Sequence, residues 1–203
     1  MKTIISDSLQ NAYTYLEYRN LVSDLIVAEK STGNVQSEEI LHYSKLNETR
    51  MNRLDKTIMI TPENVERLKL LRKEYLWLVI SEGWCGDATQ ILPIMHKMNV
   101  ISDNIEFKVV LRDEHEDLMN LFLTDGAKSI PKLIVLDAEN LEVLDTWGPR
   151  PQAAIDLVKN YKATHGIIDE KIKTDLQMWY LNDKGLSTQT EIIEIMRLAE
   201  IQE

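Results

Sequence analysis

The sequence contains few of the residues that build covalent frameworks or low-complexity structures. One cysteine among 203 residues excludes an intramolecular disulfide framework and any metal site that needs two thiolates from one chain. A chain with so little cysteine fits a reducing compartment. Seven glycines and five prolines, with 44% hydrophobic residues, exclude a collagen-like, mucin-like or disordered chain and suffice for a sizeable buried core. The length allows one domain with attached elements, or two small domains.

Basic residues are also in the minority. The chain has 33 acidic against 23 basic residues and a formal net charge of −10. Nucleic acids and anionic membrane surfaces are therefore not expected as main partners. The first residues lack the apolar region and cleavage site of a signal peptide, and the chain has no run of about 18 apolar residues that would span a bilayer. We expect a cytoplasmic protein.

The apolar pattern divides the chain into three parts. Residues 1–60 are expected to form a helical N-terminal extension, with one helix ending near Gly33 and a second helix starting after Ser37. Residues 61–165 alternate between strand and helix patterns, which predicts an α/β core with a mixed sheet. Residues 166–203 carry two further helical patterns and are expected to form a C-terminal extension.

The core region begins with a helix signal at Thr61-Pro62 and continues with a buried strand. The uninterrupted apolar run 76–80 predicts a strand that is covered on both faces. Pro93 is expected to kink the helix that contains it. The last predicted strand is close enough to its predecessor to pair with it antiparallel. After the first strand, the pattern predicts helix 89–100, strand 105–111, helix 114–123, strand 133–136, strand 141–147 and helix 151–162.

Cys85 lies between the first predicted core strand and the helix that follows it. Backbone N–H groups at a helix N-terminus stabilise an anion, so a thiol placed there can ionise below the ordinary cysteine pKa of about 8.5. Asp87 opposes this effect with its negative charge, and the sequence leaves the sign of the net shift open. Two simpler roles are a cysteine that packs as a small apolar side chain and an acid that favours the first helical turn.

Three landmarks in residues 61–165 resemble the thioredoxin superfamily. Trp84-Cys85-Gly86 matches the start of the Trp-Cys-Gly-Pro-Cys active-site turn, Pro93 stands where thioredoxins carry the proline of the active-site helix, and Ile130-Pro131 resembles their cis-proline loop. The resemblance implies a thioredoxin-like mixed sheet flanked by helices, here with helical N-terminal and C-terminal extensions. The residues that it places around a substrate of Cys85 are Trp84, Gly86, Asp87, Ile130 and Pro131.

The sequence departs from this family at two positions that matter for chemistry. Ala88 replaces the second, resolving cysteine, and Val79 stands where many thioredoxins have a buried acid. Without a second thiol, a mixed disulfide on Cys85 has to be resolved by an external thiol. The activity of a dithiol thioredoxin is therefore excluded.

Two functions are compatible with these residues. The first is a monothiol redox protein, whose Cys85 forms mixed disulfides with protein or peptide thiols or with a low-molecular-weight thiol. It predicts that alkylation of this thiol titrates well below about pH 8.5. The second is a redox-inactive module that binds peptides or proteins and uses its extensions as docking or dimer surfaces. A homodimer joined through Cys85 is a third outcome.

No cofactor and no metal are expected. The four histidines are dispersed along the chain, and none has a partner at a spacing typical of metal ligands. Glycine-rich phosphate loops, nucleophile elbows and zinc-protease motifs are also absent from the sequence.

Overall fold

A computed structural model describes residues 1–201 of the chain. Its strands form a mixed sheet in the order β1-β3-β2-β4-β5. β2 and β3 are parallel, and the other neighbouring pairs are antiparallel. The predictions of an α/β core with a mixed sheet and of an antiparallel last strand are confirmed. The strands are β1 (Tyr13–Thr14), β2 (Tyr75–Ser81), β3 (Ile105–Leu111), β4 (Lys132–Asp137) and β5 (Val143–Trp147).

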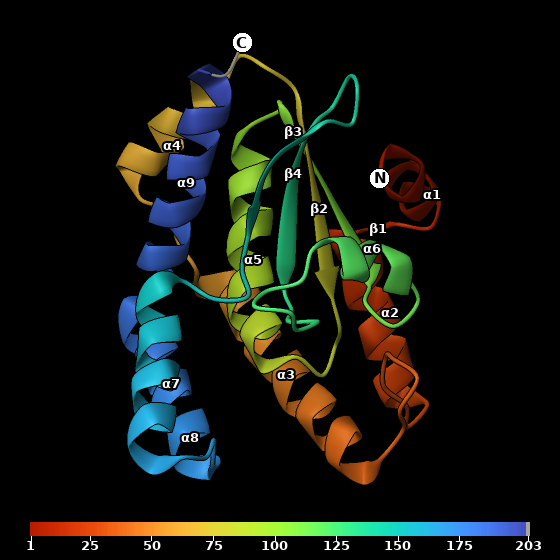
Figure 1. Ribbon diagram of the computed structural model, residues 1–203, viewed down its shortest axis with the longest axis vertical. Helices are drawn as coiled ribbons and strands as arrows, with labels where there is room; N and C mark the ends of the chain where they lie inside the picture. The colour runs from red at the N-terminus through yellow and green to blue at the C-terminus, as the bar shows by residue number, and fades with distance from the viewer. Residues whose placement is uncertain (202–203) are drawn as a thin grey trace.

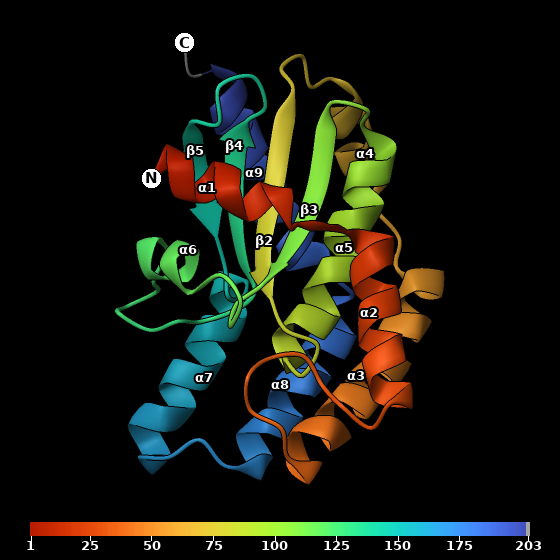
Figure 2. The ribbon, with the colours of Figure 1, turned by 90° about the vertical axis from the view of Figure 1, so that its right-hand side faces the viewer.

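Helices cover both faces of this sheet. Figure 1 shows α5 and α9 on one face and α1 and α6 on the other. In Figures 1 and 2, α3, α7 and α8 gather beyond the end of the sheet at which β2 finishes. The helices are α1 (Lys2–Gln10), α2 (Tyr15–Val27), α3 (Glu38–Thr57), α4 (Pro62–Lys69), α5 (Gly86–Ile101), α6 (Glu116–Leu121), α7 (Gln152–His165), α8 (Glu170–Asp183) and α9 (Leu186–Ile201).

Strand β2 is the central element of the core. Every residue from Tyr75 to Ser81 is buried, which confirms the prediction of a strand covered on both faces. Trp77 is completely buried, and its indole Nε1 donates a hydrogen bond to the sulfur of Met196 in α9 at 3.3 Å. The C-terminal extension therefore packs directly against the central strand. Within residues 1–201, no helix combines the length and the apolar character needed to cross a membrane.

Two predicted helix starts are confirmed by their caps, and one is wrong by a turn. The hydroxyls of Ser37 and Thr61 accept hydrogen bonds from backbone N–H groups at the starts of α3 and α4, both at 3.2 Å. Helix α5 starts at Gly86 rather than Thr89, with Cys85 as its N-cap. The Gly-Asp pair after the cysteine suggests a turn, but these residues form the first turn of the helix.

The N-terminal extension differs from the single helix predicted before Gly33. Helix α1, the two-residue strand β1 and helix α2 replace it, and α2 ends at Val27. A capping box starts α2, because the Thr14 hydroxyl accepts from Glu17 N at 3.3 Å and the Glu17 carboxylate accepts from Thr14 N at 2.7 Å. A two-residue edge strand is too short to produce a pattern in the sequence.

The C-terminal extension is fastened to the core through a buried amide. Gln189 of α9 is completely buried. Its Oε1 accepts a hydrogen bond from Thr61 N at 3.0 Å, and its Nε2 donates to the Met59 carbonyl at 3.0 Å. One side chain therefore satisfies two backbone groups of the segment between α3 and α4.

Replacing this amide tests how firmly α9 is held. We expect Gln189→Ala to lower the free energy of unfolding by about 1–3 kcal/mol, because the two backbone groups lose their partner. Urea denaturation followed by circular dichroism measures the change. Gln10→Ala, at an exposed position in α1, is the control and should leave stability unchanged. Equal stability of the two variants would contradict the anchoring role.

Candidate functional site

Cys85 lies at the N-terminus of the 16-residue helix α5, just beyond the end of β2. Its backbone N–H closes the preceding turn by donating to the Glu82 carbonyl at 3.1 Å. Its carbonyl accepts from Thr89 N at 3.2 Å, and its Sγ accepts from Ala88 N at 3.5 Å. The sulfur therefore faces the N–H groups of the first turn of α5.

The loop before β4 brings a carbonyl to the other side of the sulfur. The Ile130–Pro131 peptide bond is cis. The Cys85 thiol donates to the Ile130 carbonyl at 3.4 Å. The end of β5 packs closely against this loop at Gly148, which has a φ of +112°, and a Cβ there would lie 2.3 Å from the Pro131 oxygen. Only glycine allows this close approach.

Asp87 is held by two side chains from distant parts of the chain. It is 8% exposed, and its carboxylate forms an ion pair with Arg150 Nη2 at 2.7 Å. The Tyr180 hydroxyl donates to the other carboxylate oxygen at 2.9 Å. Arg150 follows β5, and Tyr180 lies in α8 of the C-terminal extension. Asp87 therefore ties the helix that carries Cys85 to both of these segments.

Burial decides the ionisation of Cys85. The residue is 7% exposed. Burial, and after it the Asp87 charge, raises the pKa of the Cys85 thiol to about 12, although the N–H groups of α5 and the Arg150 charge act in the opposite direction. The sign of the pKa shift, which the sequence leaves open, is therefore upward, and the low thiol pKa that the monothiol function predicts is not found. Cys85 carries its proton at neutral pH and donates it to Ile130.

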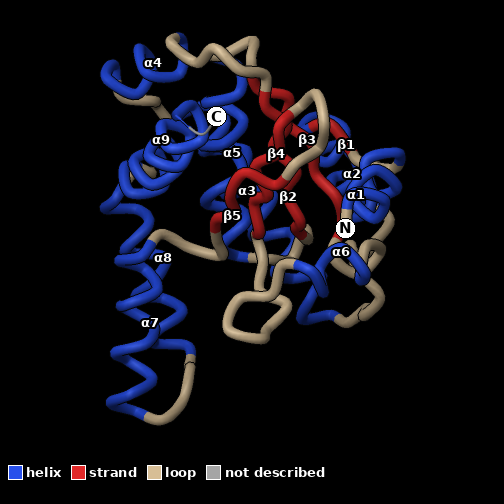
Figure 3. The backbone as a smooth tube through the Cα atoms, turned by 45° about the horizontal axis from the view of Figure 1, so that its top comes forward, coloured by secondary structure: helices blue, strands red, loops and turns tan. Residues whose placement is uncertain are grey.

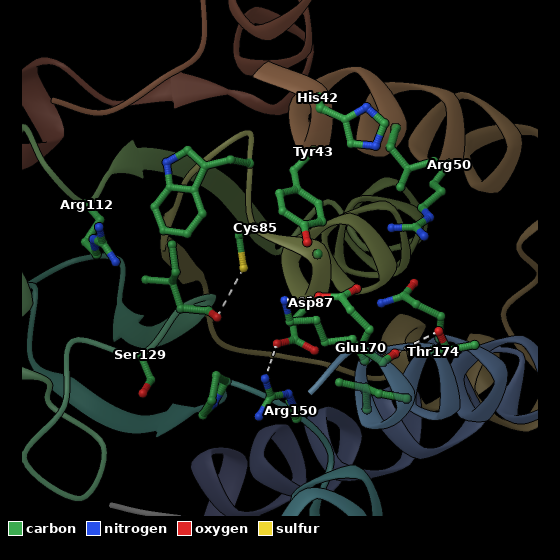
Figure 4. Close-up of a pocket in the computed structure, with 18 of the residues that line it drawn as sticks. His42, Tyr43, Arg50, Cys85, Asp87, Arg112, Ser129, Arg150, Glu170 and Thr174 are labelled. Atoms are coloured by element: carbon green, nitrogen blue, oxygen red, sulfur yellow. Dashed lines mark hydrogen bonds and ion pairs between the residues drawn. The ribbon is translucent and has the colours of Figure 1, made fainter. Parts of the chain in front are cut away.

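Cys85 nevertheless borders a cavity. Cys85 lies in the wall of a cavity of about 710 Å³ (Figure 4). Helices α3 and α8, one from each terminal extension, supply much of the wall, with His42 and Tyr43 from α3 and Thr174 from α8. Of the predicted site residues, those that line the cavity with Cys85 are Trp84, Gly86, Asp87 and Ile130.

Pro131 is the predicted site residue that does not line the cavity, although it adjoins Ile130. Lys128 and Ser129, which precede the two, do line it. Trp84 lines the cavity together with Cys85, and the Arg112 guanidinium lies 4.8 Å from the centre of its ring. The cavity therefore offers an aromatic surface and several polar groups next to one sulfur atom.

The structure places one buried acid near the site, Glu82, that the sequence prediction does not include. Val79 fills the position at which many thioredoxins carry an acid, but Glu82 is completely buried in the turn after β2. Its Oε1 accepts from Asp113 N at 3.0 Å, and burial raises the pKa of its carboxyl group. An acid directly after a buried strand is the signal that could have identified it.

Arg150 and Tyr180 are also absent from the sequence prediction, and no signal in the sequence would have found them. Tyr180 is 93 residues from Asp87. Only the packing of α8 against the start of α5 brings the two together. The described part of the chain contains no group of three or more His, Cys, Asp or Glu side chains placed to hold a metal ion.

A family model described as thioredoxin matches residues 33–162, which is more than half of the chain. The chain belongs to the thioredoxin family. The match includes the turn around Cys85, the Ile130–Pro131 loop and the whole of α3. Figure 3 shows the family's sheet, with the α7–α8 pair extending away from it.

Two solved structures resemble this thioredoxin-family protein. A protein of unknown function, PA1234 from Pseudomonas aeruginosa, has a TM-score of 0.58 at 18% identity, with 91% of this chain and 98% of that chain covered. An HIV epitope scaffold has a TM-score of 0.57 at 20% identity, with the same coverage. At these identities the likeness shows the fold alone. No curated protein matches the chain.

The raised pKa gives this thioredoxin-family protein a specific pH dependence. We expect the alkylation of Cys85 by iodoacetamide to accelerate with pH beyond about pH 10 without a plateau, because the folded-state pKa lies near 12. Asp87→Asn removes a negative charge beside the sulfur and should accelerate alkylation about tenfold near pH 8, corresponding to about one pKa unit.

Asp103→Asn, at an exposed position just after the C-terminal end of α5, is the matched control for loss of one carboxylate. It should leave the alkylation rate unchanged. A plateau near neutral pH in the unmodified protein would contradict the raised pKa, and equal rates for both variants would contradict the effect of Asp87.

Proposed function

We propose that this thioredoxin-family protein is a monothiol redox protein whose Cys85 exchanges disulfides one thiol at a time. The observation that supports it best is the position of the sulfur, which lies in the cavity wall between the N–H groups of α5 and the Ile130 carbonyl. A disulfide that enters the cavity meets this sulfur directly. The first turn of α5 then stabilises the thiolate as it forms.

The exchange proceeds in two balanced steps. In the first, Cys85 gives up its proton and its sulfur bonds to one sulfur of the substrate disulfide; the other substrate sulfur leaves with the bonding electron pair and takes up a proton. In the second, an external thiol loses its proton and attacks the substrate sulfur of the mixed disulfide. The Cys85 sulfur leaves and regains a proton. Ala88 carries no thiol that would replace the external one.

The substrate classes are protein or peptide disulfides and low-molecular-weight disulfides. A reducing compartment such as the cytoplasm would supply the resolving thiol. With a pKa of about 12, the thiolate fraction of Cys85 at pH 7 is about one in 10⁵. A thiolate of high pKa is intrinsically more nucleophilic, which offsets part of this deficit. The proposal therefore describes slow exchange that accelerates with pH.

The raised pKa also favours a second candidate, a redox-inactive binding module. A protonated, buried thiol is compatible with a packing role. In that case the cavity between α3 and α8 binds its ligand without any bond to sulfur. The two candidates differ in whether Cys85 forms a covalent adduct.

Adduct formation separates the two candidates. We expect incubation with hydroxyethyl disulfide at about pH 9 to add one mercaptoethanol unit to the protein, as seen by intact mass spectrometry, and an added monothiol to remove it. Cys85→Ser should form no adduct while keeping its circular dichroism spectrum. A folded, unmodified protein that forms no adduct under these conditions would leave only the binding module.

A further inference from the structure

The cavity around Cys85 is basic in a protein whose net charge is −10. Its lining contains two carboxylates, Asp87 and Glu170, against a larger group of cations. Such a local reversal of sign raises the concentration of anions at the site. The cationic side chains in the lining are Arg50, Arg112, Lys128, Arg150 and Lys173.

Four of these cations have carboxylate partners. Two pairs are exposed: the side chains of Lys128 and its partner are 41% and 67% exposed, and those of Lys173 and its partner are 48% and 80% exposed. Exposed pairs contribute about 0–1 kcal/mol, so these lysines can change partners when an anion enters. The four pairs are Arg150 with Asp87, Arg112 with Asp113, Lys128 with Glu116 and Lys173 with Glu170.

Arg50 of α3 is the cation in this lining without a carboxylate partner in the described chain. Its guanidinium makes one long hydrogen bond, to Asn47 Oδ1 at 3.4 Å. Partial burial lowers the pKa of Arg50, and the nearby charge of Arg53 lowers it further. Both effects mark a positive charge that nothing nearby compensates.

The carboxylates of the cavity do not compensate this charge. Asp87 is occupied by Arg150 and Tyr180, and Glu170 by Lys173. Figure 4 shows Arg50 on the α3 side of the cavity, on the same wall as Tyr43. Lys173 Nζ lies 5.8 Å from the centre of the Tyr43 ring, so a second, exchangeable cation approaches this wall from α8.

We propose that Arg50 selects the ligand by binding the carboxylate of a small anionic disulfide or thiol whose sulfur meets Cys85. The proposal rests on the monothiol function proposed above. The cavity volume of about 710 Å³ lies within the range of about 300–1,000 Å³ that is typical of sites for small ligands. A guanidinium binds a carboxylate through two parallel hydrogen bonds, which also orients the molecule.

Three small disulfides of different charge test this selection. They are dithiodipropionate, which is anionic, hydroxyethyl disulfide, which is neutral, and cystamine, which is cationic. We expect the anionic disulfide to form the mixed disulfide with Cys85 about tenfold faster than the neutral one, and the cationic one to be slowest. The preference should shrink as salt is added.

Substitutions at Arg50 assign the preference to this side chain. Arg50→Gln should remove most of the preference for dithiodipropionate over hydroxyethyl disulfide, while Arg50→Lys should retain part of this preference. Arg53→Gln makes the same change of charge on the same helix, at an exposed residue outside the cavity lining. This control should keep the preference.

Each contrary result has a separate meaning. Equal rates with the three disulfides would overturn the anion site and leave the monothiol function standing. A preference for a disulfide carried by an acidic peptide, without any preference among the three small disulfides, would also overturn the site for small anions and leave the monothiol function standing. If none of the disulfides reacts, the monothiol function fails, and binding of methylthiopropionate followed by NMR becomes the test. Binding that Arg50→Gln abolishes would support the anion site, and its absence would overturn it.

Discussion

The desolvation of one sulfur atom governs the behaviour of this site. The end of β2 delivers Cys85 to the N-terminus of α5, where backbone N–H groups favour a thiolate, yet 7% exposure and the Asp87 carboxylate favour the thiol. Burial has the larger effect on the pKa, so the thiol keeps its proton and donates a hydrogen bond to the Ile130 carbonyl. A helix N-terminus alone therefore does not make a cysteine acidic when water is kept away from it.

The terminal extensions build the surroundings of that sulfur. Helix α3 and helix α8 supply walls of the cavity, and Tyr180 of α8 holds the carboxylate next to Cys85. Gln189 and the contact between Trp77 and Met196 fasten α9, which follows α8, to the core. The extensions are consequently part of the site as well as a cover for the sheet, and the charge on α3 gives the cavity its selectivity for anions.

The sequence predicts those features that are determined by residues close together in the chain. The apolar run of β2 and the caps at Ser37 and Thr61 depend on neighbouring residues. The resemblance to the thioredoxin superfamily rests on short motifs of the same local kind, and the family model confirms the family. Helix α1 and the two-residue strand β1 were missed because their signal is short or weak. The sign of the Cys85 pKa shift depends on burial by segments far away in sequence.

The contacts of Asp87 and the charge of the cavity were beyond prediction for the same reason. Arg150 and Tyr180 reach Asp87 only after β5 and α8 have packed. In the apolar pattern of α3, Arg50 has the position of an ordinary surface residue. Its proposed role in anion binding depends on the cavity that it lines. Tertiary packing places these residues, and nothing in their sequence neighbourhoods distinguishes them.

The single cysteine allows a direct test of the central claim, that Cys85 is protonated at rest and yet reachable from the cavity. Protein labelled with ¹³C at the cysteine Cβ gives one NMR signal for this residue. The account predicts a thiol signal that persists up to about pH 10 and converts to a disulfide signal when a small disulfide is added. A signal that moves to the thiolate position near neutral pH, or one that no disulfide changes, would contradict it.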